Sequence, residues 1–305
     1  MFDFLTAATL QTQDFNDQTE FLIDGFLAKN LITMVYADGG NGKSWLGLAL
    51  AKYCAELRMQ IVYLDFDNPL SVLQERGVDQ TLVARYRNVQ YVQRSKSKLT
   101  AIELLSELAI NATANVYDNV LIVLDSLRNF GDVNAESRMM HVMTHLMDIR
   151  EAGATIVVLH HSNKDGKNYQ GSNHIRNSVD NMFQLKKFDI AGGIGMLLKV
   201  QKERAAITDQ AFEICPSTLA IIPRSLVEAQ STDEDLDFIN EVQATLRNQP
   251  GLNKTDLLNA IGFNKDDKTA RARLDKFDGI HWHSVKRGNR YGYQLIMVAA
   301  TPQPQ

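Results

Sequence analysis

The sequence predicts an α/β fold in which helices cover a mostly parallel β-sheet. Short apolar runs alternate with longer segments whose apolar residues recur at helical spacing. A glycine-rich loop joins the first apolar run to the first helical segment. The four runs that we interpret as strands span 31–37, 61–66, 119–125 and 154–160. Strands separated by crossover helices favour a parallel sheet that is buried on both faces.

Composition narrows the class of protein. The 305 residues include 32 Lys plus Arg and 36 Asp plus Glu, a net charge of −4, which argues against a general coat on nucleic acid but allows a local basic track. No apolar run reaches the ~18 residues of a membrane span, and the start resembles no signal peptide. Cys54 and Cys215 stand far apart without metal spacing. We therefore expect a cytoplasmic protein with no membrane partner.

Two domains are expected from the change of pattern along the chain. After residue 175 the segments become short, β-rich and closely spaced, which favours an antiparallel extension of the sheet. A polar, acidic stretch at 227–232 is predicted to be a linker. The core then spans 1–226, a second module 233–298, and a loose tail 299–305.

The second module is predicted to hold three helices and a hairpin. The helices are expected at 233–248, 253–261 and 265–277, and the hairpin at 280–297. Between Lys265 and Arg290 the chain has eight Lys and Arg against four Asp, a net charge of +4, whereas 233–237 is acidic. Trp282, Tyr291 and Tyr293 are expected in the hairpin core.

The loop ADGGNGKS at 37–44 follows a strand and opens a helix, as a phosphate-binding loop does. Glycines let successive backbone N–H groups turn toward phosphates, and the helix N-terminus adds a positive dipole end. Ala37 replaces the first glycine of the pattern, a position that precedes the inward-pointing amides. The loop predicts ATP and Mg²⁺ as cofactors, with ATP contacts from Gly39, Gly40, Asn41, Gly42, Lys43, Ser44 and Trp45.

Three other predicted strands end in chemically useful side chains, and ligands of open α/β sheets lie at such ends. Asp125 closes the 119–125 run and can hold Mg²⁺ together with the Ser44 hydroxyl. Asp65 and Asp67 stand at the end of the second strand, where a carboxylate could polarise a water or both could simply form a turn before a proline. His160 and His161 end the fourth run, and one of them could sense the γ-phosphate while the other packs.

Lys202 and Arg204 occupy one face of a later predicted strand. Two cations at this spacing suit an arginine-finger role toward a nucleotide, either in the same chain or from a neighbouring subunit. A solvated basic strand edge explains the same pattern.

The ordered set of motifs resembles the RecA-type core of hexameric helicases, and most closely the small RepA-type replicative helicases of plasmids and phages. The resemblance covers about residues 20–225, and only the phosphate loop is specific by itself. The segments that carry it are ADGGNGKS, YLDFDNPLSVLQER, LIVLDSLRNF, VVLHHSNK, QGSNHIRNSVDN and KVQKER.

The resemblance implies a role for each matching residue. Lys43 and Ser44 match the phosphate-loop lysine and the Mg²⁺ hydroxyl, and Asp125 matches the second Mg²⁺ residue. Asp67 stands where the family usually has a catalytic glutamate, one methylene longer, and would orient or accept a proton from the attacking water. His161 is our choice for the γ-phosphate sensor, with His160 close behind.

The resemblance also implies assembly and DNA contacts. Lys202 and Arg204 match a Lys-x-Arg pair that reaches the ATP of the next subunit, so a hexameric ring would complete the site. Two loops, 128–138 and 162–177, would line the pore and hold single-stranded DNA. The DNA contacts expected from the second loop are Lys164, Lys167 and Arg176.

The module at 233–298 resembles a winged helix in its pattern of helices and hairpin. That resemblance would place Arg271, Arg273 and Arg287 near duplex DNA. A protein-binding or ring-stabilising module is the alternative.

Taken together, these features predict a ring-forming, ATP-dependent DNA helicase that translocates on single-stranded DNA in plasmid or phage replication, with an initiator or primase as a possible partner. A helicase loader or recombination mediator that uses ATP as a switch is the first alternative. A DNA-tethering regulator without motor activity is the second. A nucleoside kinase would leave the C-terminal module unexplained.

Overall fold

The computed structural model describes residues 9–12, 18–164, 166–287 and 290–296. The chain divides into two compact units, 1–229 and 230–305, which are treated separately below. Within the described residues, no helix combines the length and apolarity needed to cross a membrane.

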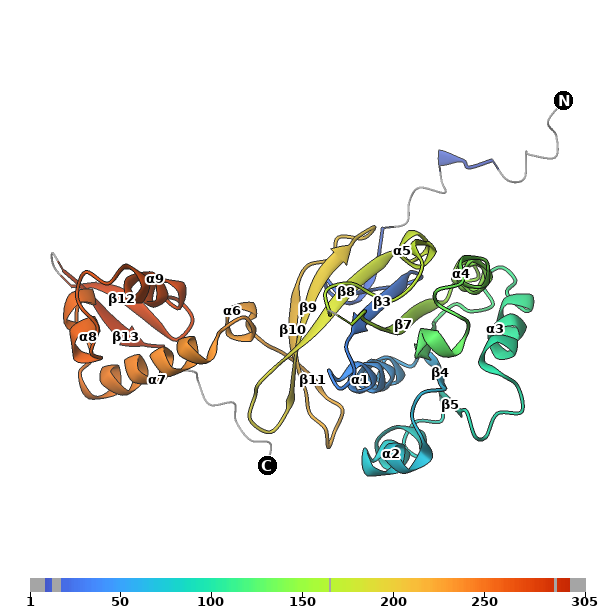
Figure 1. Ribbon diagram of the computed structural model, residues 1–305, viewed down its shortest axis with the longest axis horizontal. Coiled ribbons are helices and arrows are strands. Elements are labelled where there is room, and N and C mark those ends of the chain that lie inside the picture. Colours follow the sequence, from blue (N-terminus) through green and yellow to red (C-terminus); the bar gives the residue numbers. More distant parts are fainter. Residues whose placement is uncertain (1–8, 13–17, 165, 288–289, 297–305) are drawn as a thin grey trace. The chain divides into compact units, whose positions relative to one another are not determined.

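The first unit is built on a nine-stranded sheet with the order β11-β10-β9-β8-β3-β7-β6-β4-β5 (Figure 1). Its parallel strands are β3 (Ile32–Ala37), β4 (Gln60–Asp65), β5 (Val89–Gln93), β6 (Val120–Asp125), β7 (Thr155–His161) and β8 (Asn181–Phe188). The antiparallel extension consists of β9 (Ile194–Lys202), β10 (Gln210–Ile214) and β11 (Ile221–Pro223). A separate hairpin pairs β1 (Phe21–Ile23) with β2 (Leu27–Ala28). The mostly parallel α/β sheet predicted from the sequence is confirmed.

Helices cover both faces of this sheet, because successive strand side chains point to opposite faces. Val35 of β3 packs in the core beneath α1 (Lys43–Glu56), to which α2 (Leu70–Glu75) adds Leu73. Met34, its neighbour, packs on the other face. The helices of that face are α3 (Ala101–Ile110), α4 (Glu136–Glu151) and α5 (Asn173–Ser178).

Strand direction gives the sheet two chemically different edges. We call the edge where β3, β4, β6 and β7 end the carboxyl edge, and the opposite one the amino edge. β9 runs antiparallel to β8, with Gly195 opposite Phe188 and Lys202 opposite Met182. Lys202 therefore lies toward the amino edge, away from the loop that follows β3.

Two local differences from the sequence prediction have simple reasons. β5 was not among the predicted apolar runs, because its sequence VQYVQ mixes polar and apolar residues, as suits the edge of a sheet. Part of the predicted 227–232 linker is helical. Leu226–Ala229 forms α6, which packs on β9 and β10, so the first unit extends to residue 229.

In its described residues, 230–287 and 290–296, the second unit contains three helices and a hairpin, at nearly the predicted positions. The helices are α7 (Asp233–Asn248), α8 (Lys254–Ala260) and α9 (Lys268–Lys276), followed by β12 (Trp282–Arg287) and β13 (Arg290–Leu295). Trp282 is fully buried, and its indole N–H donates to the Leu274 carbonyl at 3.1 Å. Tyr293 is also buried. Tyr291 is 57 % exposed, so its predicted place in the hairpin core is wrong.

Candidate nucleotide site

The phosphate loop connects β3 to α1 through residues 38–42. Gly40 and Gly42 have φ of 80° and 90°, a conformation that side chains with a Cβ rarely adopt. Gly42 is also the N-cap of α1, so the helix opens directly at Lys43. The loop thus brings backbone N–H groups and a helix N-terminus to one place at the carboxyl edge.

Lys43 is folded back onto its own loop. Its side chain is 8 % exposed, and Nζ donates to the carbonyls of Ala37 and Asp38, each at 2.9 Å. Burial lowers the pKa of Lys43, with partial compensation from nearby carboxylates. A phosphate oxygen would give this ammonium a charged partner in place of neutral carbonyls.

A cavity of about 230 Å³ opens above the loop. The elements that line it are the phosphate loop, the segment after β4, the end of α2, and the ends of β6 and β7. Its lining residues are Gly39, Gly40, Gly42, Lys43, Ser44, Trp45, Asp67, Asn68, Arg76, Asp125 and His161. Most of the predicted ATP contacts therefore surround one cavity.

Asp125 ends β6 and is almost fully buried beside Ser44. Its carboxylate accepts hydrogen bonds from the Tyr63 hydroxyl at 3.0 Å and the Asn68 amide at 3.3 Å. Burial, together with the negative charge of Asp65, raises the pKa of Asp125 to about 6. A hydroxyl and a carboxylate are oxygen ligands of the kind that Mg²⁺ prefers, and a cation here would offset the repulsion between the two acids. The donor set therefore fits Mg²⁺.

Asp65 and Asp67 diverge, because β4 ends at Asp65. Asp65 is fully buried and accepts from the Tyr91 hydroxyl at 2.6 Å and from the backbone N–H groups of Asp67 and Asn68. It also accepts from the Asn68 amide. Asp65 therefore fixes the turn after β4 and does not line the cavity.

Asp67 does line the cavity, and it is ionised there. Arg128 Nη2 donates to Asp67 Oδ1 at 2.6 Å, and His161 Nε2 lies 3.8 Å from Oδ2. The His161 and Arg128 side chains hold the pKa of Asp67 well below its usual range, despite partial burial. A carboxylate of this kind is suited to orienting a water rather than to accepting its proton.

The two histidines of β7 point to opposite faces. His161 lines the cavity, and its Nε2 lies 3.5 Å from Ser126 Oγ. His160 is buried on the other face and bonds through Nε2 to the Gln170 carbonyl. Burial lowers the pKa of His160 to about 4, so the ring is neutral and its Nε2 carries the proton. The structure thus places His161, our choice for the sensor, at the nucleotide cavity.

Sequence reasoning missed several residues of this site. Arg76, at the end of α2, lies over the Trp45 ring at 5.5 Å and donates to Asn68 at 3.2 Å. Asn68 in turn reaches Ser44, Asp65 and Asp125. The only signal in the sequence was position, since both residues belong to the segment that follows the second strand.

Lys202 and Arg204 do not reach this cavity. Lys202 Nζ donates to three carbonyls around the end of α5, those of Arg176, Val179 and Asn177, at 2.6, 2.7 and 3.2 Å. Arg204 pairs with the buried Asp180 at 2.8 Å. Sheet register puts this cluster toward the amino edge, which excludes a finger acting on the nucleotide of its own chain.

The two predicted pore loops contact each other. The Ser172 N–H donates to the Val133 carbonyl at 2.9 Å. Lys164 and Lys167 are exposed before α5. The second loop is shorter than predicted, because Arg176 lies on α5, where it donates to the Gln201 carbonyl at 2.9 Å.

In the second unit, one predicted DNA contact has an internal role instead. Arg273 pairs with Asp235 at 2.7 Å and Glu234 at 3.0 Å and lies over the Phe238 ring, so we withdraw it from the DNA-binding set. Arg271 is half-buried and donates to the Lys265 carbonyl at 2.8 Å. The Arg287 side chain lies outside what the structure describes.

One known protein family matches more than half of this chain. Residues 3–167 match the AAA_25 family, described as an AAA domain. No curated protein matches the chain. A similar solved structure is the flagellar accessory protein FlaH from Methanocaldococcus jannaschii, which is 14 % identical, with 67 % of this chain and 93 % of that chain covered and a TM-score of 0.46. Because the family match spans more than half of the sequence, the chain belongs to the AAA_25 family of AAA domains and has a RecA-like P-loop ATPase core.

Proposed function

We propose that the protein is a DNA-stimulated ATPase of the ring-helicase class, which translocates on single-stranded DNA in plasmid or phage replication. One observation carries this proposal. The two predicted DNA loops begin at the nucleotide cavity, since Arg128, which opens the first, pairs with Asp67, and His161 immediately precedes the second. DNA held by these loops would act directly on the groups around the γ-phosphate.

The proposed chemistry assigns one task to each group. Lys43 and the loop N–H groups bind the β- and γ-phosphates. Ser44 and Asp125 would hold Mg²⁺, which supplies charge neutralisation at the phosphates when bound. The Asp67 carboxylate orients a water for in-line attack, and His161 hydrogen-bonds near the γ-phosphate. Translocation would follow from loop movement as each site passes from ATP to ADP.

A neighbouring subunit would complete the site. Lys202 and Arg204 lie toward the amino edge of their own sheet, so in a head-to-tail ring they can face the carboxyl edge of the next copy. The buried Asp180 would then fix the direction of the Arg204 guanidinium. This assignment makes hydrolysis dependent on assembly into a hexamer.

The second unit would act as a winged-helix-like module. Lys268 is the first residue of α9, Lys265 lies just before it, and both are exposed. Arg271 lies on the same helix, and the hairpin adds Lys286. These cations support contact with duplex DNA, to which Arg287 would add. A ring-stabilising role is the competing use of this unit.

The test is ATP hydrolysis with and without single-stranded DNA, combined with the mass of the assembly in Mg²⁺ and a non-hydrolysable ATP analogue. Strong stimulation by DNA in a hexamer-sized particle supports the motor and justifies unwinding assays of both polarities. Slow ATP turnover that DNA does not stimulate, in a monomer or dimer, contradicts the motor proposal.

A second candidate is a helicase loader or recombination mediator that uses ATP as a switch. The observation that favours it is the internal pairing of Lys202 and Arg204, which leaves an isolated subunit without a finger at its own nucleotide. This function predicts slow hydrolysis and binding to a partner protein that depends on ATP.

A further inference from the structure

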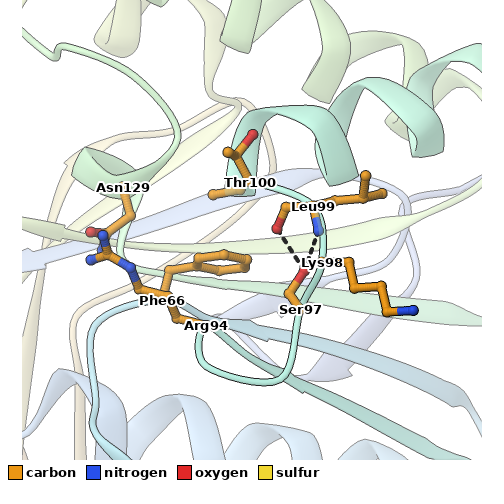
Figure 2. A pocket seen from close by; sticks show the side chains of 8 residues that line it. Phe66, Arg94, Ser97, Lys98, Leu99, Thr100 and Asn129 are labelled. Carbon is orange, nitrogen blue, oxygen red and sulfur yellow. Dashed lines mark hydrogen bonds between the residues drawn. The ribbon is translucent and has the colours of Figure 1, made fainter.

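A second cavity lies at the carboxyl edge, next to the nucleotide site. It has a volume of about 380 Å³ and is bounded by the ends of β4 and β5, the loop 94–100, the start of α3 and the turn after β6 (Figure 2). It is lined by Phe66, Arg94, Ser97, Lys98, Leu99, Thr100, Ala101 and Asn129. Its volume is within the range of small-ligand sites in proteins.

The chemistry of this cavity favours an anionic ligand with a flat ring. Among the described lining residues, Arg94 and Lys98 are cationic and none is acidic. Phe66 lines the cavity, as Figure 2 shows, with the 7 % of its surface that stays exposed, and its ring packs edge to face on Phe130 behind it. A phosphate beside two cations, with a base beside an aromatic ring, is how single-stranded nucleic acid is usually held.

The cavity wall is ordered by its own hydrogen bonds. The Arg94 N–H donates to the Asp65 carbonyl at 3.1 Å, which ties the loop to the end of β4. Ser97 Oγ bonds both to the carbonyl and to the N–H of Leu99, as the dashed lines in Figure 2 show. Thr100 and Glu103 then form a reciprocal cap at the start of α3. Arg94 and Lys98 therefore belong to a loop whose conformation is held by hydrogen bonds.

One residue joins this cavity to the catalytic carboxylate. Asn129 lines the cavity, its amide donates to the Ser126 carbonyl at 3.3 Å, and its side chain helps to lower the pKa of Asp67. Its neighbour Arg128 pairs with the same carboxylate at 2.6 Å, and Phe66 directly precedes Asp67 in the chain. A ligand in the cavity thus lies one side chain away from the group that would orient the attacking water.

We propose that this cavity binds one nucleotide of single-stranded DNA, and that Asn129 transmits its occupancy to Asp67. The inference rests on the proposed function and adds a DNA subsite whose cationic loop, 94–100, lies outside the two predicted pore loops, while Asn129 belongs to the first of them. Arg94 and Lys98 hold a backbone phosphate, Phe66 lies against the base, and Asn129 is a positioning residue. Movement of Asn129 shifts its neighbour Arg128 and so changes the ion pair between Arg128 and Asp67, which couples DNA binding to hydrolysis.

The binding test uses the full chain with a fluorescently labelled oligo(dT) and a non-hydrolysable ATP analogue, followed by anisotropy over a range of salt. The double variant Arg94→Ala/Lys98→Ala is expected to lose at least about tenfold in affinity, and the magnitude of its salt slope is expected to fall by about 0.7, as for one phosphate that is no longer neutralised. Its ATP hydrolysis without DNA stays at the wild-type rate.

Lys96→Ala is the matched control, because Lys96 lies on the same loop but lines a different, apolar cavity. It is expected to bind close to wild type. An equal loss in Lys96→Ala, or wild-type affinity in the double variant, overturns the subsite while leaving the proposed function intact. Failure of the wild-type chain to bind oligo(dT) overturns both.

The coupling is tested with Asn129→Ala. This variant is expected to bind oligo(dT) nearly as the wild type does, while the rise in kcat that DNA causes falls at least about fivefold and the KM for ATP stays unchanged. A retained DNA response, with folding confirmed by the same thermal midpoint, overturns the role of Asn129. A parallel change in KM alone would indicate a nucleotide contact and contradict it as well.

Discussion

Both edges of the central sheet carry buried charged residues, but these residues differ in their partners: charged groups at one edge and neutral groups at the other. Toward the amino edge, the buried Asp180 accepts from the Ile32 N–H, from Arg150 and from Arg204. At the carboxyl edge, Asp125 has only neutral hydrogen-bond donors and a neighbouring acid, and burial raises its pKa to about 6. Lys43, also at this edge, is buried, and its ammonium donates hydrogen bonds to two backbone carbonyls.

This difference in hydrogen-bond partners separates charged groups that stabilise the fold from charged groups that are suited to binding a ligand. A buried carboxylate with two guanidinium partners and a backbone N–H is satisfied within the chain. Buried charges without an opposite partner are costly, and sites that bind charged ligands hold such groups ready. The carboxyl edge is therefore suited to a charged ligand, whereas Asp180 links Ile32 of β3, Arg150 of α4 and Arg204.

The largest expected effect is at the carboxyl edge. Lys43→Ala is expected to lower ATP turnover by at least about 10³-fold, because the γ-phosphate loses its ammonium partner. The thermal midpoint should stay equal or rise slightly, since a buried charge is removed. Steady-state hydrolysis and a thermal scan measure both. Lys52→Ala, on the same helix and paired with Glu56, is the control and should hydrolyse normally. Unchanged hydrolysis in Lys43→Ala would refute the site.

Arg204→Ala tests whether the amino-edge cluster acts on a neighbouring nucleotide. A finger is worth on the order of 10³-fold in turnover, so a comparable loss is expected. Mixing Arg204→Ala with Lys43→Ala subunits should restore part of the activity, because one mixed interface then has both an intact loop and an intact arginine. If both variants assemble and mixing restores nothing, action from the neighbour is excluded.

Asp180→Ala addresses stability instead. Removing this carboxylate leaves the Ile32 N–H without its partner and Arg150 with Glu151 alone, and a free energy of unfolding lower by about 3 kcal/mol is expected. Urea denaturation measures the change. Asp189→Ala, an exposed acid of the same unit, should stay within about 0.5 kcal/mol of wild type. A loss that small in Asp180→Ala would show that the cluster does not hold the fold.

His160 also lies at the carboxyl edge, but it is buried and faces away from the cavity, so its protonation is expected to affect stability. Its pKa of about 4 lies below the unfolded value of about 6.5, so its contribution to stability is complete above pH 6.5 and falls toward pH 4. Between pH 7 and pH 5, wild type should lose about 2 kcal/mol more than His160→Gln. Equal losses, measured by urea unfolding at both values, would mean that His160 is not held neutral.

Local pattern was enough for most elements of the first unit. Runs such as 31–37 and 119–125 are almost wholly apolar, and a strand buried on both faces explains that composition next to helical periodicity. β5 escaped prediction because an edge strand needs no such run. Helix α6 was not predicted because four residues are too few to show a helical periodicity. Its helical conformation is accompanied by packing against β9 and β10.

For the site, the sequence by itself determined the groups that depend on short-range order. The phosphate loop, Lys43, Ser44 and the strand-end Asp125 follow from spacing along the chain, since a parallel sheet brings all strand ends to one edge. Side-chain direction was not so determined. Asp65 and Asp67, like His160 and His161, are nearly adjacent in sequence yet face different surroundings, which only the end of β4 and the pleat of β7 decide.

Pairings between distant segments were decided by the tertiary structure alone. Arg128 meets Asp67 across 61 positions, Arg204 meets Asp180 across a hairpin, and Arg273 folds inward onto Asp235. Sequence spacing carries no information on such contacts, because the same charged residue type occurs whether the side chain faces solvent, a ligand or a buried partner. Only packing determines which of these the chain provides, and that choice separates the groups that hold the fold from those free to bind.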